Sequence, residues 1–180
     1  MTGRRGGHGD VLLVDGYNII GAWPELQRLK ELGLEEARDR LLDLLADYQG
    51  FTGMEVIVIF DAHQVPGLGK TFRQHKLTVL YTKEKETADE CIERQVIAMA
   101  RRSRAIYVAT SDLVEQHVAF GKGALRISAR ELLIGIQQNR RAIERQVEAE
   151  QRAQARRNPL DSKLGDSVRE RLERMRRGED

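Results

Sequence analysis

The sequence has a single cysteine, no long apolar run and almost no excess charge of either sign. Cys91 alone among 180 residues excludes an internal disulfide framework and fits a reducing compartment. No apolar run approaches the roughly 20 residues that span a membrane, and the start, MTGRRGGHGD, lacks the apolar region of a secretory signal. We therefore expect a cytoplasmic protein without a membrane partner, in which residues 1–9 are a disordered leader.

Charge is balanced over the whole chain but uneven along it. Thirty basic and 28 acidic residues give a net charge of +2, so the total charge does not identify a partner. Between residues 62 and 85, five basic residues stand against one acid. They are Lys70, Arg73, Lys76, Lys83 and Lys85. Such a stretch fits either a phosphate-backbone contact or a solvated loop.

Short apolar segments alternate with helical patterns. The predicted strands cover residues 11–14, 55–60, 77–82, 105–110 and 125–128. The predicted helices cover residues 33–49, 87–102, 111–120 and 128–157, with a last short helix near 161–177. This alternation predicts an α/β fold with a central, mainly parallel sheet of about five strands. We expect residues 10–157 to form the main domain and residues 158–180 a helical extension.

Acidic residues follow the predicted strands at the edge where sites of open α/β sheets form. Asp15, Asp61 and Asp112 follow the first, second and fourth strands. Glu86, Asp89 and Glu90 surround the start of the helix after the third strand, where Thr87 and Glu90 form a capping-box pattern. Taken singly, each acid also fits a helix cap or a turn.

Taken together, the acids favour a metal site. Clustered carboxylates repel one another unless a cation is present, so gathering four of them has no structural benefit. Mg²⁺ or Mn²⁺ prefers such oxygen ligands and supports phosphoryl chemistry. We assign catalytic roles to Asp15, Asp61, Asp89 and Asp112. Asp15, Asp89 and Asp112 would bind the metal, and Asp61 would act directly or through a bound water.

Polar and basic neighbours complete the predicted site. Asn18 and Ser111 would hydrogen-bond the acids or a phosphate, and Glu86 would support the metal ligands from beside the site. The RNA backbone contacts are assigned to Lys70, Arg73, Lys83 and Lys85. Gly16 is expected to let the chain turn out of the sheet.

Other conspicuous residues fit structural roles. Tyr17 would pack under the site, and Trp23 with Pro24 would anchor a loop before a helix. His63 fits a loop residue and Cys91 a core residue better than a reactive group.

Five motifs resemble the YacP-like NYN domain proteins, bacterial relatives of the PIN-domain nucleases. They are LLVDGYNIIGAWPEL, VIVIFDAH, YTKEKETADECIE, ATSDLVEQ and GALRISARELL, and they match in order and spacing over roughly residues 10–150. The resemblance implies a PIN-like three-layer α/β/α fold whose acids match Asp15, Asp61, Asp89 and Asp112. It also implies a metal-dependent ribonuclease that cuts mRNA in association with the translating ribosome.

Three hypotheses follow for the function. The leading one is a metal-dependent endoribonuclease. The alternative is a non-catalytic RNA- or ribosome-binding module with a PIN-like fold, although a bare carboxylate cluster would repel phosphate. A small-molecule phosphatase or receiver-type domain also places an acid after the first strand, but it would not explain the basic stretch.

Overall fold

The computed structural model describes residues 9–62, 71–74, 76–83, 85–100, 104–111, 123–157, 171 and 174–177. The chain divides into two units, Met1–Asn139 and Arg140–Asp180. The first unit contains the whole sheet. All but the first residue of the predicted helix at 111–120, and most of the predicted helix near 161–177, lie outside the described residues.

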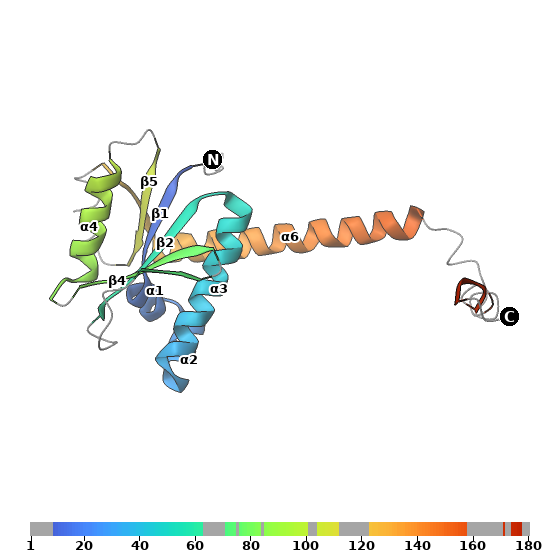
Figure 1. Cartoon of the computed structure of the whole chain (residues 1–180), viewed down its shortest axis with the longest axis horizontal. Coiled ribbons are helices and arrows are strands. Elements are labelled where there is room, and N and C mark those ends of the chain that lie inside the picture. Colours follow the sequence, from blue (N-terminus) through green and yellow to red (C-terminus); the bar gives the residue numbers. More distant parts are fainter. Residues whose placement is uncertain are drawn as a thin grey trace. The chain divides into compact units, whose positions relative to one another are not determined.

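A six-stranded sheet forms the centre of the first unit (Figure 1). Its order is β3 (Thr71–Gln74), β4 (Leu77–Tyr81), β2 (Glu55–Phe60), β1 (Val11–Asp15), β5 (Ile106–Thr110) and β6 (Leu125–Ser128). The five strands from β4 to β6 are parallel, which confirms the predicted parallel sheet. The structure adds β3, which pairs antiparallel with β4 at one edge. Its sequence, TFRQ, has one apolar residue, so no strand pattern indicated it.

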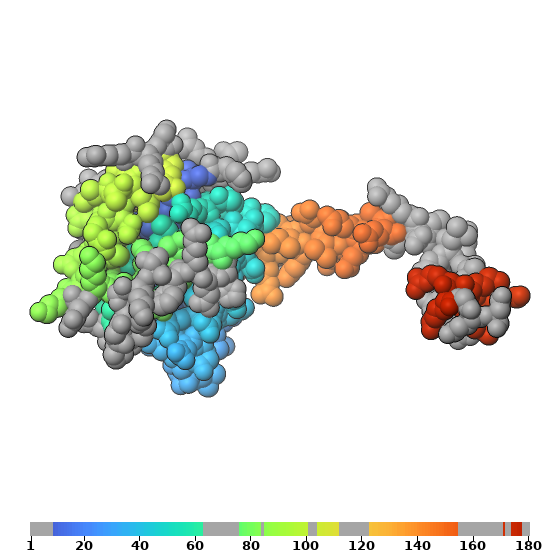
Figure 2. Space-filling view, in the orientation of Figure 1, coloured from blue at the N-terminus to red at the C-terminus, as the bar shows by residue number. Residues whose placement is uncertain are grey.

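Helices cover both faces of the sheet, which confirms the three-layer α/β/α fold. One face is covered by α1 (Gly16–Ala22), α2 (Pro24–Leu32), α3 (Leu34–Thr52) and the start of α6 (Ala129–Arg157). The other is covered by α4 (Ala88–Met99). Leu12 and Val14 pack with the first group, whereas Val11 and Leu13 pack with α4. Figure 2 shows α4 and α2 on different parts of the surface of the first unit.

The burial of the central strand β1 explains why its segment is the most apolar short segment of the sequence. Its residues from Val11 to Val14 have exposed fractions of 0%. Strands on both sides and helices on both faces leave no solvent-facing position. Each such aliphatic side chain contributes roughly 1.5–3 kcal/mol by leaving water. The strand is therefore held firmly, and the residue that ends it, Asp15, has a defined place.

Two features at helix starts match the sequence predictions. Thr87 Oγ1 accepts a hydrogen bond from the Glu90 amide at 3.2 Å, and Glu90 Oε2 accepts one from the Thr87 amide at 3.0 Å. This is the predicted capping box of α4. Trp23 is 2% exposed and lies between α1 and α2. Its Nε1 donates to the carbonyl oxygen of Ala129 at 2.8 Å, which ties it to the start of α6.

The second unit contains the charged part of α6. Its residues 140–154 are exposed and carry ion pairs one helical turn apart, such as Arg140–Glu144 at 3.3 Å and Arg152–Glu148 at 3.6 Å. Each such exposed pair contributes little, roughly 0.3–0.5 kcal/mol. Within the described part of the chain, no helix is long and apolar enough to cross a membrane.

The Trp23–Ala129 hydrogen bond generates the first prediction. Trp23→Phe removes this buried bond and part of the buried ring, so we expect the free energy of unfolding to fall by about 1–3 kcal/mol. Urea denaturation followed by far-ultraviolet circular dichroism measures the change. Leu32→Ala is the control, because Leu32 on α2 is 79% exposed and its truncation should change stability by less than about 0.5 kcal/mol. Equal stability of the two variants would contradict the anchoring role.

Candidate active site

Asp15 ends β1 and caps α1 in the same step. Its side chain is 7% exposed, and its Oδ1 accepts a hydrogen bond from the Asn18 amide at 3.2 Å. The capping interpretation is therefore correct for Asp15. It is compatible with a site role, because a carboxylate fixed between a buried strand and a helix start is pre-organised for binding.

Gly16 is needed for close packing, a reason that differs from the prediction. It is the first residue of α1, and a Cβ atom there would overlap the ring of Phe60 at the end of β2. Tyr17 packs against the same ring at a centroid distance of 4.9 Å, and Phe60 packs against Tyr81 at 5.6 Å. This aromatic group joins the carboxyl ends of β2 and β4 to the start of α1, and it confirms that Tyr17 is a packing residue.

Asn18 connects the ends of β1 and β5. Its Oδ1 accepts hydrogen bonds from the Ser111 amide at 2.6 Å and from Ser111 Oγ at 2.7 Å. The backbone amide of Asn18 donates a hydrogen bond to Asp15 Oδ1. Three predicted site residues thus form one chain of hydrogen bonds across neighbouring strand ends. Asp112, the next residue after Ser111, lies outside the described residues.

Asp61 directly follows β2 and is half-buried. The next residue, Ala62, donates its amide to Thr82 Oγ1 at 2.9 Å, and the Thr82 amide donates to the Phe60 carbonyl at 3.0 Å. Thr82 is 0% exposed and sets the position of the chain around Asp61. No sequence motif indicated a role for Thr82. Its only signal was a threonine at the carboxyl end of an apolar strand.

The charge of Asp61 also reaches α1. Burial raises the pKa of the Tyr17 phenol, the nearby Arg38 guanidinium opposes this rise, and the negative charge of Asp61 adds to it. Asp61 and Tyr17, which stands two residues after Asp15, are therefore electrostatic neighbours, although they follow different strands.

The loop between β4 and α4 is held by Glu86. Its Oε1 accepts hydrogen bonds from Arg94 Nε at 3.0 Å and Nη2 at 2.7 Å, and its Oε2 accepts one from the Lys83 amide at 3.1 Å. Both carboxylate oxygens are thus engaged in fixing this loop. A role of Glu86 beside a metal stays a prediction.

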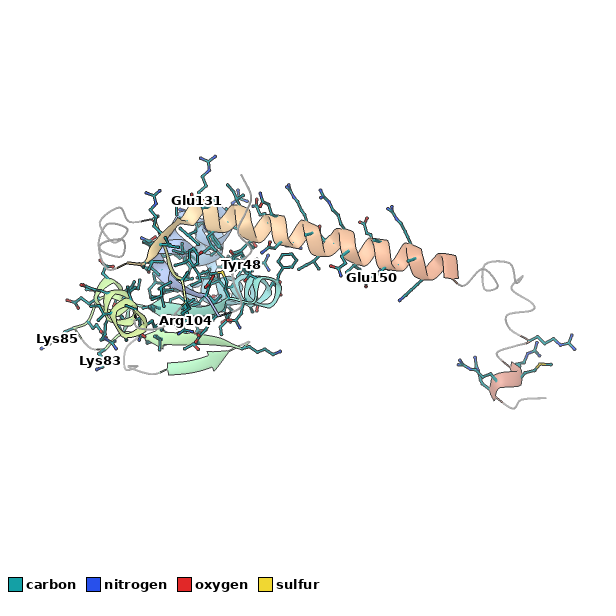
Figure 3. The ribbon with its side chains drawn as sticks, turned by 90° about the horizontal axis from the view of Figure 1, so that it is seen from above. Tyr48, Lys83, Lys85, Arg104, Glu131 and Glu150 are labelled. Atoms are coloured by element: carbon teal, nitrogen blue, oxygen red, sulfur yellow. The ribbon has the colours of Figure 1, made fainter. Side chains whose placement is uncertain are left out.

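Asp89 and the two lysines lie in the same region. Asp89 is exposed in the first turn of α4. Lys83 and Lys85 are also exposed and lie close together, on a different side of the first unit from Glu131 of α6 (Figure 3). Lys70 and the side chain of Arg73 lie outside the described residues.

The donor chemistry of the acids fits a hard divalent cation, because every candidate ligand is a carboxylate. Within the described residues, however, no group of three histidine, cysteine, aspartate or glutamate side chains could hold one metal ion. Asp15, Asp61 and Asp89 alone do not complete such a site. Asp112 follows Ser111 and so belongs to the part of the chain that the structure does not describe.

Comparisons with known proteins agree on one family. A model of the YacP-like NYN domain family matches residues 12–177. The chain is 55% identical to the uncharacterized protein YacP of Bacillus subtilis (strain 168) over 138 residues, which cover 77% of this chain and 81% of that protein. The crystal structure of Rae1 (YacP) from Bacillus subtilis matches with a TM-score of 0.71 at 48% identity, over 94% of this chain and 95% of that one. A mutant of Rae1 matches with the same TM-score at 51% identity, over 79% and 84% of the two chains.

The cap at Asp15 generates the second prediction. Asparagine is an equally good N-cap, so Asp15→Asn should unfold with a free energy at least equal to that of the wild type. Asp15→Ala loses the cap and should be less stable by about 0.5–2 kcal/mol. Urea denaturation in the presence of a metal chelator measures both. If Asp15→Asn is as unstable as Asp15→Ala, the carboxylate has a structural role beyond the cap.

The Glu86 ion pair generates a prediction for acid pH. Burial alone would raise the pKa of Glu86, but hydrogen bonds from the Lys83 amide and from Arg94, with the positive charges of both residues, lower it below its usual value. A lowered folded-state pKa stabilises the protein fully above the unfolded-state pKa. This stabilisation is lost as pH falls through the folded-state pKa. We therefore expect the stability difference between wild type and Glu86→Gln to be large at neutral pH and to shrink below about pH 4.3.

Thermal unfolding measured across this pH range checks the trend. Glu31→Gln is the matched control, because Glu31 is exposed on α2 and makes no hydrogen bond or ion pair with a described residue. A difference between wild type and Glu86→Gln that is independent of pH would rule out the ion pair as its cause.

Proposed function

We propose that this chain, which belongs to the YacP-like NYN domain family with its nuclease-like fold, is a metal-dependent endoribonuclease. The observation that carries the proposal is the buried Asp15 carboxylate at the carboxyl edge of the sheet, held by the Asn18 amide at 3.2 Å. Asn18 in turn accepts two hydrogen bonds from Ser111, so the residue directly before Asp112 is held in place.

The proposed ligands of Mg²⁺ or Mn²⁺ are Asp15, Asp89 and Asp112, with Asp61 acting directly or through a bound water. When bound, such an ion supplies an activated water and neutralises charge on the phosphate. The chain's own residues fix the geometry. Asn18 orients the end of β1, and Thr82 holds the backbone beside Asp61. Rigid support of this kind keeps the acids in position when a charged substrate arrives.

The proposed substrate is mRNA, cut in association with the translating ribosome in the cytoplasm. The exposed Lys83 and Lys85 beside the α4 acids support a phosphate-backbone ligand, because lysine contacts to phosphates position a strand without reading its sequence. Lys70 and Arg73 are assigned to the same backbone contact. The association with the ribosome is inferred from the resemblance of the five sequence motifs to the family.

Neutralising two acids tests the chemistry. We expect Asp15→Asn combined with Asp89→Asn to abolish mRNA cleavage in a purified translation system, while binding to RNA or ribosomes persists. Mapping the 5′ ends of the mRNA fragments measures the cleavage. The control is Asp39→Asn with Asp47→Asn, which changes the net charge equally. Both residues are exposed on α3, and neither makes a hydrogen bond or an ion pair with a described residue.

A second readout tests the metal without activity. Mn²⁺ should raise the melting temperature of the wild type and of the α3 control, but not that of the Asp15→Asn, Asp89→Asn variant, because ligand binding stabilises only a protein that has the site. Cleavage that survives in the acid variant would disprove the nuclease assignment. A wild type that binds ribosomes without cutting any mRNA would support the binding-module alternative.

A further inference from the structure

A pocket of about 500 Å³ opens beside the candidate acids, at the carboxyl ends of β5 and β6. Its apolar part is formed by Trp23, Pro24 and Leu133, and its polar part includes Arg126 and Arg130. The volume falls within the range of roughly 300–1,000 Å³ that is common for small-ligand sites. Apolar walls with a few convergent polar groups are typical of such sites.

The two arginines of this pocket have charge to offer a ligand. Both side chains are exposed, and within the described residues neither guanidinium forms a hydrogen bond or an ion pair. Arg126 acts electrostatically on Glu131, whose pKa is lowered mainly by hydrogen bonds from Ser128 and further by the charge of Arg126. Glu131 Oε2 already accepts from the Ser128 amide and hydroxyl at 2.8 and 2.7 Å, and Glu131 does not line the pocket.

One side chain belongs to both the pocket and the acid network. Ser111 lines the pocket and donates to Asn18, whose amide donates to Asp15. In the sheet, β6 is separated from β1 by β5 alone. Two strand spacings amount to about 10 Å. A ligand in the pocket would therefore lie near the acids without contacting Asp15.

We propose that this pocket binds one nucleotide of the RNA strand beside the scissile phosphate. The base would lie against the exposed Pro24 and the half-buried Leu133, and Arg126 and Arg130 would bind the adjoining phosphate. The proposal rests on the nuclease function and adds a binding subsite to it. Bases pack on apolar and aromatic surfaces regardless of sequence, and arginine binds phosphate oxygens in pairs.

The order of the strands supports a single path for the RNA. Lys83 follows β4 and the Arg126 pocket adjoins β6, which lie on opposite sides of β2 and β1 in the sheet. The acids Asp61 and Asp15 follow those two middle strands. A strand that crosses the carboxyl edge of the sheet would thus meet positive charge on both sides of the acids, and the scissile phosphate would be held at the acids between them.

The test measures binding of a single-stranded RNA dodecamer by fluorescence anisotropy, with the full-length protein carrying Asp15→Asn and Asp89→Asn so that the RNA stays intact. Arg126→Gln with Arg130→Gln should weaken binding about 10- to 100-fold. It should also reduce the slope of log affinity against log salt by about 0.7, the value for one phosphate that is no longer neutralised on a single strand. Arg141→Gln with Arg145→Gln is the matched control, because both residues are exposed on α6, the helix that carries Arg130, and lie outside the pocket.

Photocrosslinking of a 4-thiouridine dodecamer locates the base. We expect crosslinks in peptides that contain residues 22–24 or 126–133, and we expect them to disappear in the Arg126→Gln, Arg130→Gln variant. Crosslinks confined to other segments, equal affinity of this variant and the control, or no binding of the dodecamer by the parent protein would each overturn the pocket.

Cleavage assays separate this inference from the proposed function. If the acid variant stops cleavage but Arg126→Gln with Arg130→Gln binds and cuts as the wild type does, only the pocket proposal fails. If RNA crosslinks to the pocket while the wild type cuts no mRNA, the nuclease proposal fails and the subsite stands.

Discussion

A carboxylate buried at the end of the central strand is the constraint around which this fold is arranged. An ionised group that leaves water requires hydrogen bonds or a cation to offset the loss of hydration. The fold meets part of this need with the Asn18 amide at the start of α1. Because Gly16 lies under the Phe60 ring, the helix start packs closely against β2. The position of Asp15 is thus set by these few residues.

Hydrogen bonds between side chains and the backbone also hold the ends of the neighbouring strands in place. On one side of β1, Asn18 Oδ1 accepts a hydrogen bond from the backbone amide of Ser111, which follows β5. On the other side, Thr82 Oγ1 accepts a hydrogen bond from the backbone amide of Ala62, which follows β2. Both contacts join segments that follow different strands, so they fix the strand ends where Asp15 and Asp61 occur. Loops supported in this way on a rigid sheet are the usual place for binding and catalytic residues.

Charge is arranged along this edge in a way that suits a polyanion. The acids follow the middle strands, whereas Lys83 follows β4 and Arg126 belongs to β6. Acidic side chains alone would repel a phosphate backbone. Basic side chains alone would bind the backbone without cleaving it. A pocket with apolar walls at the β6 side adds a place for a base. These features together favour a site that holds a strand on both sides of the reacting phosphate.

The sequence by itself determined five parallel strands, the acids at their ends, the Thr87–Glu90 cap and the Trp23 anchor, because apolar periodicity and capping are encoded within a few residues. Only the tertiary structure decided that β3 joins the sheet, why residue 16 is glycine and that Asn18 binds Ser111, 93 residues away. It also decided that residues 22–24, 111 and 126–133 enclose a pocket. Contacts of this kind depend on how distant segments pack, which no local pattern contains.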